Sequence, residues 1–224
     1  PADFELLAVY VSIITLVTVV SCLRYNLAIP IPDQDDKAIS LLALSVIASI
    51  GFTVIISVCV FVFPNYFLLL LGRLDLAPYL WMVPVGVLLA SLYNALQYWA
   101  SRRRHFAIIT RTRMARAVGG VGSQLGIGAL SSGPFGLIFG HMLYGGLGVL
   151  RLATSLWASD RACLSTLTLS GMRVTAFEYR KFPLLSVPEA FFNTAGSQLP
   201  LLIVAATTLS AEAGYLMLAM RVMG

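Results

Sequence analysis

The sequence predicts an all-α protein, a polytopic bundle with about seven transmembrane helices. Of its 224 residues, 58% are hydrophobic and only 11% are charged, whereas ordinary soluble domains have roughly 25% charged residues. The apolar residues also gather in runs of about 18 residues or more, the length that crosses a bilayer as a helix. The runs are too long and too uniformly apolar to be the alternating strands of an outer-membrane barrel.

Each apolar run is predicted to form a helix, because lipid offers no water to satisfy backbone amides. The runs are Leu6 to Leu23, Ile39 to Phe63, Tyr79 to Trp99, Met114 to Leu130, Phe135 to Trp157, Leu184 to Thr207, and one that starts near Ala213. Aromatic residues stand near the predicted span ends, where the headgroup region favours amphipathic rings. They are Tyr79, Trp81, Tyr98, Trp99 and Trp157.

Basic residues alternate between successive connections and so predict the orientation. Every odd-numbered connection is basic, whereas the even-numbered connections carry only Arg73 between them. The positive-inside rule then places the odd connections in the cytoplasm and Pro1 on the outer face of the membrane. The net charge of +5 therefore reflects topology. Membrane lipids are expected partners, and nucleic acid is not.

The chain begins with Pro1 rather than Met and ends within an apolar run, so we expect it to be an internal part of a longer protein. Residues 158–183 form the longest polar stretch and are predicted to be a cytoplasmic linker. This linker separates a first transmembrane bundle, residues 1–157, from the start of a second, residues 184–224.

No enzymatic motif is found. P-loop, HExxH and GxSxG patterns are absent, and the glycine-rich AVGGVGSQLGIGALSSGPFG does not fit GxGxxG. Its glycines have instead the small-xxx-small spacing that lets membrane helices approach closely, at Gly122 with Gly126 and at Gly136 with Gly140. We therefore expect neither an enzyme nor a cofactor.

The three cysteines do not suggest a metal site or a disulfide. Cys22, Cys59 and Cys163 are an odd number and lack CxxC spacing. Two of them lie in or at the end of apolar runs, and the third lies in the predicted linker.

Polar side chains within the apolar runs are better candidates for function, because each is costly in lipid and tends to face a bundle interior or a water-filled path. Asn193, Ser197 and Gln198 recur on one helical face, either as hydrogen-bonding groups between helices or as a cavity wall. Glu189 is either an ordinary interfacial carboxylate or an ion-coupling group in a proton-coupled cycle. The other candidates are Asn94, Gln97, Ser123, Gln124, His141 and Arg151.

Arginines are dense around the third connection, at the predicted cytoplasmic mouth. Topology and contacts with anionic lipids explain most of this basic collar. A pyrophosphate-bearing substrate would explain its density better, because a guanidinium binds phosphate oxygens in a bidentate manner. The collar consists of Arg102, Arg103, Arg104, Arg111, Arg113 and Arg116.

Three stretches resemble the Wzx-type oligosaccharide flippases of the multidrug/oligosaccharidyl-lipid/polysaccharide exporter superfamily. They are LRYNLAIPIPDQDDKA, LAPYLWMVPVGVLLASLYNALQYWASRRRHFAIITRTR, and YRKFPLLSVPEAFFNTAGSQLP with AEAGYLMLAMRV. The resemblance implies a protein of about twice this length with two six-helix bundles. This chain would hold helices two to six of the first bundle, the linker and the start of the second bundle.

The resemblance also implies the function. Such proteins are transporters of the bacterial inner (plasma) membrane. They flip undecaprenyl-pyrophosphate-linked oligosaccharides from the cytoplasmic to the periplasmic leaflet for surface polysaccharide (O-antigen) biosynthesis, and other polysaccharide assembly proteins are candidate partners. By position, the resemblance implies that the substrate is bound by the cations Arg24, Arg113, Arg116, Arg180, Lys181 and Arg221. From the polar helical face described above, Asn193 and Gln198 are further candidates for substrate binding.

Two alternatives remain open at this point. A cation-coupled multidrug exporter of the same superfamily should have a more apolar, acidic-lined cavity and fewer arginines at its mouth. A membrane polysaccharide polymerase should have a large periplasmic loop with clustered polar residues, whereas the predicted periplasmic loops are short.

Overall fold

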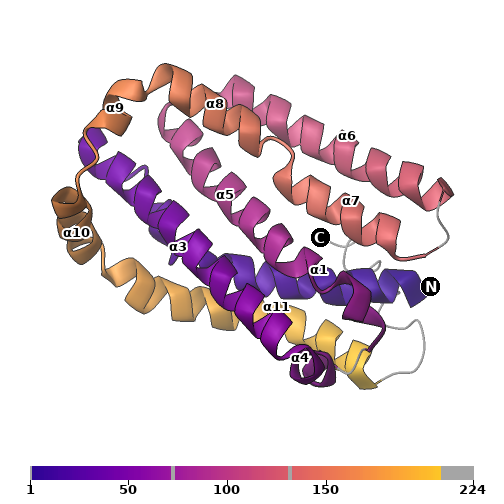
Figure 1. Ribbon diagram of the computed structural model, residues 1–224. Coiled ribbons are helices and arrows are strands. Elements are labelled where there is room, and N and C mark those ends of the chain that lie inside the picture. Colours follow the sequence, from indigo (N-terminus) through magenta and orange to yellow (C-terminus); the bar gives the residue numbers. More distant parts are fainter. Residues whose placement is uncertain (1, 72–73, 131–132, 208–224) are drawn as a thin grey trace.

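The computed structural model of the protein describes residues 2–71, 74–130 and 133–207. Within these ranges every regular element is a helix, which confirms the predicted all-α fold (Figure 1). Among the described residues, three segments are long and apolar enough to cross a membrane. They are Asp3–Ser21, Asp35–Val62 and Phe135–Ser159.

Long helices form where apolar runs occur. They are α1 (Ala2–Ser21), α3 (Asp35–Val62), α5 (Met82–Arg102), α6 (Phe106–Leu130) and α11 (Val187–Thr207). Short elements connect them: α2 (Tyr25–Ala28), α4 (Pro64–Leu71), η1 (Leu74–Tyr79), α9 (Arg161–Ser165), α10 (Leu169–Glu178) and η2 (Phe182–Ser186). The run predicted to start near Ala213 lies outside the described residues.

The fifth predicted span is discontinuous. It consists of α7 (Phe135–Gly146) and α8 (Val149–Ser159), which meet end to end (Figure 1). Gly148 lies between them with φ 100°, a backbone conformation that L side chains rarely adopt. A Cβ atom at this position would also lie 2.9 Å from the Cβ of Thr112. Glycine is therefore required where the helix breaks.

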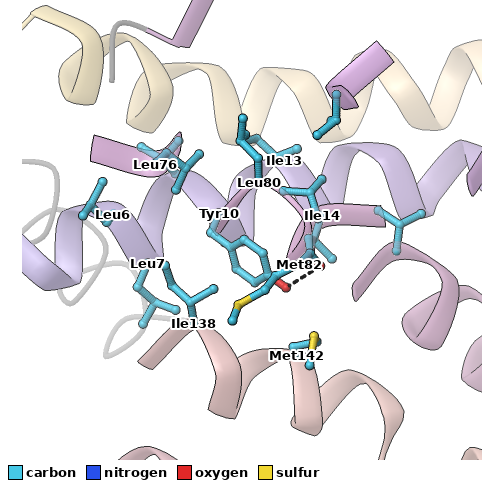
Figure 2. Close-up of a cluster of buried hydrophobic side chains, with 14 of the residues drawn as sticks. Leu6, Leu7, Tyr10, Ile13, Ile14, Leu76, Leu80, Met82, Ile138 and Met142 are labelled. Atoms are coloured by element: carbon cyan, nitrogen blue, oxygen red, sulfur yellow. Dashed lines mark hydrogen bonds between the residues drawn. The ribbon is translucent and has the colours of Figure 1, made fainter. Parts of the chain in front are cut away.

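Helix α1 is the central helix, and it packs against α5, α7 and α11. Its Tyr10 is fully buried, and the hydroxyl donates a hydrogen bond of 3.1 Å to the backbone carbonyl of Met82. Figure 2 shows this ring surrounded by apolar side chains, among them Leu7, Ile14 and Ile138. The phenol is tolerated in this apolar cluster because its polar atom has a partner.

The odd-numbered connections meet at one end of the bundle, the basic end. Arg102 is the last residue of α5 and Arg103 follows it, and both pair with Asp35 at the start of α3, at 2.9 and 3.0 Å. Arg103 also pairs with Asp160 at 2.9 Å. These two collar arginines therefore hold the connections together, which is a structural role that the sequence did not indicate.

The buried carboxylate of Asp160 joins two of these connections. It accepts a hydrogen bond of 3.0 Å from Trp99 Nε1 besides its ion pair with Arg103. We expect Asp160→Asn to lower the free energy of unfolding by about 1 to 2 kcal/mol, because a partly exposed guanidinium loses its charged partner. The loss in free energy of unfolding is measured by titration with a denaturing detergent, with the helix content followed by circular dichroism. The exposed Asp36 provides the control, and an equal loss in Asp36→Asn would contradict the assignment.

Glycines bring α6 and α7 together. A Cβ atom at Gly136 would lie 2.9 Å from the backbone nitrogen of Gly128, and one at Gly140 would lie 3.0 Å from that of Gln124. The predicted close approach is confirmed for this pair. A Cβ atom at Gly122 or Gly126 would meet no atom within 4 Å, so these two glycines do not bring helices together in the described part of the chain.

Candidate functional site

A polar cavity of about 420 Å³ lies between α1, α5, α6 and α7, close to the turn that follows α1. Three of the in-span polar residues singled out from the sequence line it, namely Asn94, Gln97 and His141. Two of the predicted cations, Arg24 and Arg116, line it as well. The structure thus brings together residues that lie more than a hundred positions apart in the sequence.

Unpaired polar atoms mark the end of the cavity near Arg24. Within the described residues, Thr18 Oγ1, Arg24 Nε and Asn26 Oδ1 are buried without a hydrogen-bond partner. Asn26 is only 8% exposed. Leaving buried polar atoms unpaired is costly, at about 1 to 3 kcal/mol for each group. All three residues line the cavity, so a polar ligand there can satisfy these atoms.

The backbone at Arg24 has an uncommon conformation. Leu23 and Arg24 have φ values of 49° and 59°, which are rare for side chains of this size. This left-handed turn redirects the chain from α1 into α2 and places the guanidinium of Arg24 at the cavity. Local strain of this kind often occurs at ligand sites.

Arg116 is fixed by aromatic rings and by one backbone carbonyl. Its guanidinium carbon lies 3.8 Å from the ring centroid of Tyr93 and 4.4 Å from that of Tyr144. Its Nε donates a hydrogen bond of 2.6 Å to the carbonyl oxygen of Tyr144. That carbonyl is in the last turn of α7, where helical acceptors lose their partners. Arg116 is therefore held by neutral groups and keeps its charge available.

The lining residues suit a ligand that is both anionic and rich in hydroxyl groups. The cavity presents two guanidinium groups, side-chain amides and hydroxyls, whereas no carboxylate is among its lining residues in the described part of the chain. Guanidinium groups bind phosphate oxygens, and amides both donate to and accept from hydroxyl groups. The aromatic lining residue Tyr98 offers a face on which a sugar ring can stack, whereas the ring of Tyr144 is covered by the guanidinium of Arg116.

Other predicted site residues lie away from this cavity. Arg113, Arg180, Lys181, Glu189 and Asn193 are exposed, and none is among the lining residues. Arg221 lies outside the described residues. Gln198 accepts a hydrogen bond of 2.9 Å from Ser12 Oγ and so joins α11 to α1. The polar face of α11 was interpreted either as hydrogen-bonding groups between helices or as a cavity wall. The bond of Gln198 fits the first interpretation.

Several lining residues were missed from the sequence. Thr18 is a small polar residue in an otherwise apolar run, and Tyr144 carries no charge that would draw attention to it. Asn26 had the clearest signal, because it stands two residues after Arg24 in LRYNL.

Comparison with known proteins yields no match. No family model, no curated protein and no solved structure matches this sequence. The cavity, the apolar runs and the distribution of basic residues therefore indicate the function.

Proposed function

We propose that this chain is part of a flippase that carries undecaprenyl-pyrophosphate-linked oligosaccharides across a bacterial inner membrane. The observation that carries the proposal is the composition of the cavity: Arg24 and Arg116 occur with amides, hydroxyls and tyrosines, and no carboxylate is among its described lining residues. The protein moves its substrate without changing it covalently.

The two guanidinium groups would bind the pyrophosphate. Nε of Arg116 is occupied by the Tyr144 carbonyl, so its two terminal nitrogens remain to form a bidentate contact with one phosphate. Arg24 has an unpaired Nε close to Thr18 and Asn26 and would hold the second phosphate. Asn94, Gln97 and Tyr98 would then face the first sugars.

The same cavity argues against a cation exporter. An organic cation needs a carboxylate or an open aromatic face, whereas the described lining has no carboxylate and the guanidinium of Arg116 already covers the ring of Tyr144. Two fixed positive charges in the cavity would repel such a substrate. We therefore place the exporter second.

In the proposed arrangement the chain crosses the membrane seven times and supplies most of one lobe of a two-lobed transporter. The basic end faces the cytoplasm, because its connections carry most of the basic residues. The cavity then opens toward the leaflet in which lipid-linked precursors are assembled.

Arg116 and Arg113 provide a matched test, since both are arginines on α6 and only Arg116 lines the cavity. The full-length protein is reconstituted in vesicles that contain the lipid-linked glycans extracted from the cells that carry it. We expect Arg116→Gln to slow glycan translocation about tenfold, because one charge-assisted contact is lost. Arg113→Gln should translocate at close to the wild-type rate.

Two results would overturn the proposal. In the first, vesicles with wild-type protein translocate glycan no faster than protein-free vesicles but do transport organic cations, which identifies an exporter. A larger loss in Arg113→Gln than in Arg116→Gln would remove the cavity as the substrate site. Circular dichroism of each variant shows that the helices are intact.

A further inference from the structure

A second cavity, of about 450 Å³, adjoins the polar one. The two cavities share His141 and Tyr144, which lie one helical turn apart on α7. Most of the second lining is apolar or lacks a side chain: Leu7, Val11, Ala117, Gly120 and Val121. The polar exception besides the shared residues is Gln124, whose amide already donates a hydrogen bond of 3.3 Å to the Leu137 carbonyl.

The two cavities are adjacent, since they share lining residues, and together they are called the trough. The polarity of the lining changes from one cavity to the other. On α1 the lining residues follow one helical stripe, from Leu7 and Val11 in the apolar cavity to Thr15 and Thr18 in the polar cavity. On α6 the polar cavity ends at Arg116 and the apolar cavity begins at Ala117. A ligand that fills both cavities must be polar at one end and apolar at the other.

The apolar cavity is next to the outer surface of α6. Ala117 and Val121 line the apolar cavity and are also exposed at the surface of α6. Their neighbours Val118 and Leu125 are 72% and 70% exposed, and neither lines the cavity. A bundle face with such exposed apolar side chains is suited to contact with lipid. An apolar chain can therefore pass from the bilayer into this cavity.

We infer that the apolar cavity, between α1, α6 and α7, holds the start of the isoprenoid chain of a lipid-linked substrate while its pyrophosphate occupies the polar cavity. This inference rests on the proposed function and adds a second subsite to it. The adjacency of the two cavities at His141 and Tyr144, together with the change from apolar to polar lining, selects this occupant over a purely apolar lipid.

The direction of the trough fits a lipid in one leaflet. Its polar end lies near the turn after α1, toward the basic end of the bundle, and its apolar end lies toward the start of α1. A lipid in the leaflet at the basic end has its headgroup at that surface and its chain toward the middle of the membrane. The ligand would thus enter the trough without reversing its direction.

A steric block tests the subsite. Ala117→Phe fills the apolar cavity, whereas Val118→Phe adds the same side chain one position away, on the exposed surface. The probes are undecaprenyl pyrophosphate and methyl pyrophosphate, which lacks the chain, and binding to the full-length protein is measured by calorimetry in detergent. We expect Ala117→Phe to weaken undecaprenyl pyrophosphate binding at least about tenfold. Methyl pyrophosphate binding should change less than about twofold, and Val118→Phe should leave both affinities unchanged.

The outcomes separate the two proposals. If wild-type protein binds neither probe, the proposed function fails. If it binds both probes, and an Ala117→Phe variant with an unchanged circular dichroism spectrum leaves the long-chain affinity unchanged or lowers both affinities equally, only the chain subsite fails. A variant that fails to fold would lose methyl pyrophosphate binding too, and would then differ from the expected pattern.

A photoreactive amino acid in place of Val121 identifies what covers the apolar cavity. With the radiolabelled isoprenoid probe present, we expect a cross-link to the lipid, and the yield should fall when unlabelled undecaprenyl pyrophosphate is added. A cross-link to another segment of the polypeptide would show that protein covers this cavity and would overturn the subsite.

Discussion

Arg24→Gln should weaken pyrophosphate binding by roughly 10- to 100-fold, because a charge-assisted contact contributes about 1.5 to 3 kcal/mol. Glutamine keeps a polar, though shorter, side chain and removes the positive charge. The left-handed turn at this position remains, so the helices should be preserved. Calorimetric titration of the full-length protein with methyl pyrophosphate measures the change without any contribution from the lipid chain.

Arg104 offers a close control for this substitution. It is also an arginine with a positive φ value, 58° against 59° for Arg24, but it is exposed and lies outside the cavity lining. Arg104→Gln therefore reproduces the change in charge and in backbone preference. Equal losses of affinity in the two variants would mean that general attraction to the basic end, rather than the cavity, binds the pyrophosphate.

Gly136→Val should lower the free energy of unfolding by about 2 to 3 kcal/mol, through overpacking between α6 and α7. The new Cβ atom would lie 2.9 Å from the backbone nitrogen of Gly128 and 3.1 Å from Ile127 Cγ2. Backbone cannot rotate out of the way as a long side chain can, so the helices must separate. Detergent-induced unfolding followed by circular dichroism gives the loss.

Gly126→Val is the matched control, because a Cβ atom at Gly126 would meet nothing within 4 Å in the described part of the chain. It adds the same side chain at a glycine that lies in a helix and also belongs to a small-xxx-small pair. If it destabilised the protein as much as Gly136→Val, the loss would come from valine in a helix and not from the contact between α6 and α7.

Much of the fold follows from the apolar runs. Helices α1, α3, α5, α6 and α11 overlap the predicted runs, because a helix satisfies the backbone of an apolar segment internally. The break between α7 and α8 was not predicted. Its signal is the sequence GGLG, in which Gly148 adopts a positive φ. Hydropathy does not register such a break, since glycine and leucine are both compatible with a span.

The site was harder to predict than the helices. Arg113 and Arg116 are equivalent by composition and charge, and only the packing of α6 on α7 determines that Arg116 meets Tyr93 and Tyr144. Asn94, Gln97 and His141 were recognised as polar residues within apolar runs, yet their common cavity depends on how the helices are rotated. The sequence supplies the candidates, and the contacts between helices select among them.

The anchoring of Arg116 by a carbonyl and two aromatic rings has an electrical consequence. No carboxylate among the described lining residues offsets Arg116 or Arg24, so the empty cavity carries about two positive charges that a bound pyrophosphate diester would cancel. A membrane potential acts on charge at about 2.3 kcal/mol per elementary charge per 100 mV. With the cytoplasm negative, the voltage would act mainly on the unloaded protein and draw its empty cavity back toward the cytoplasmic side.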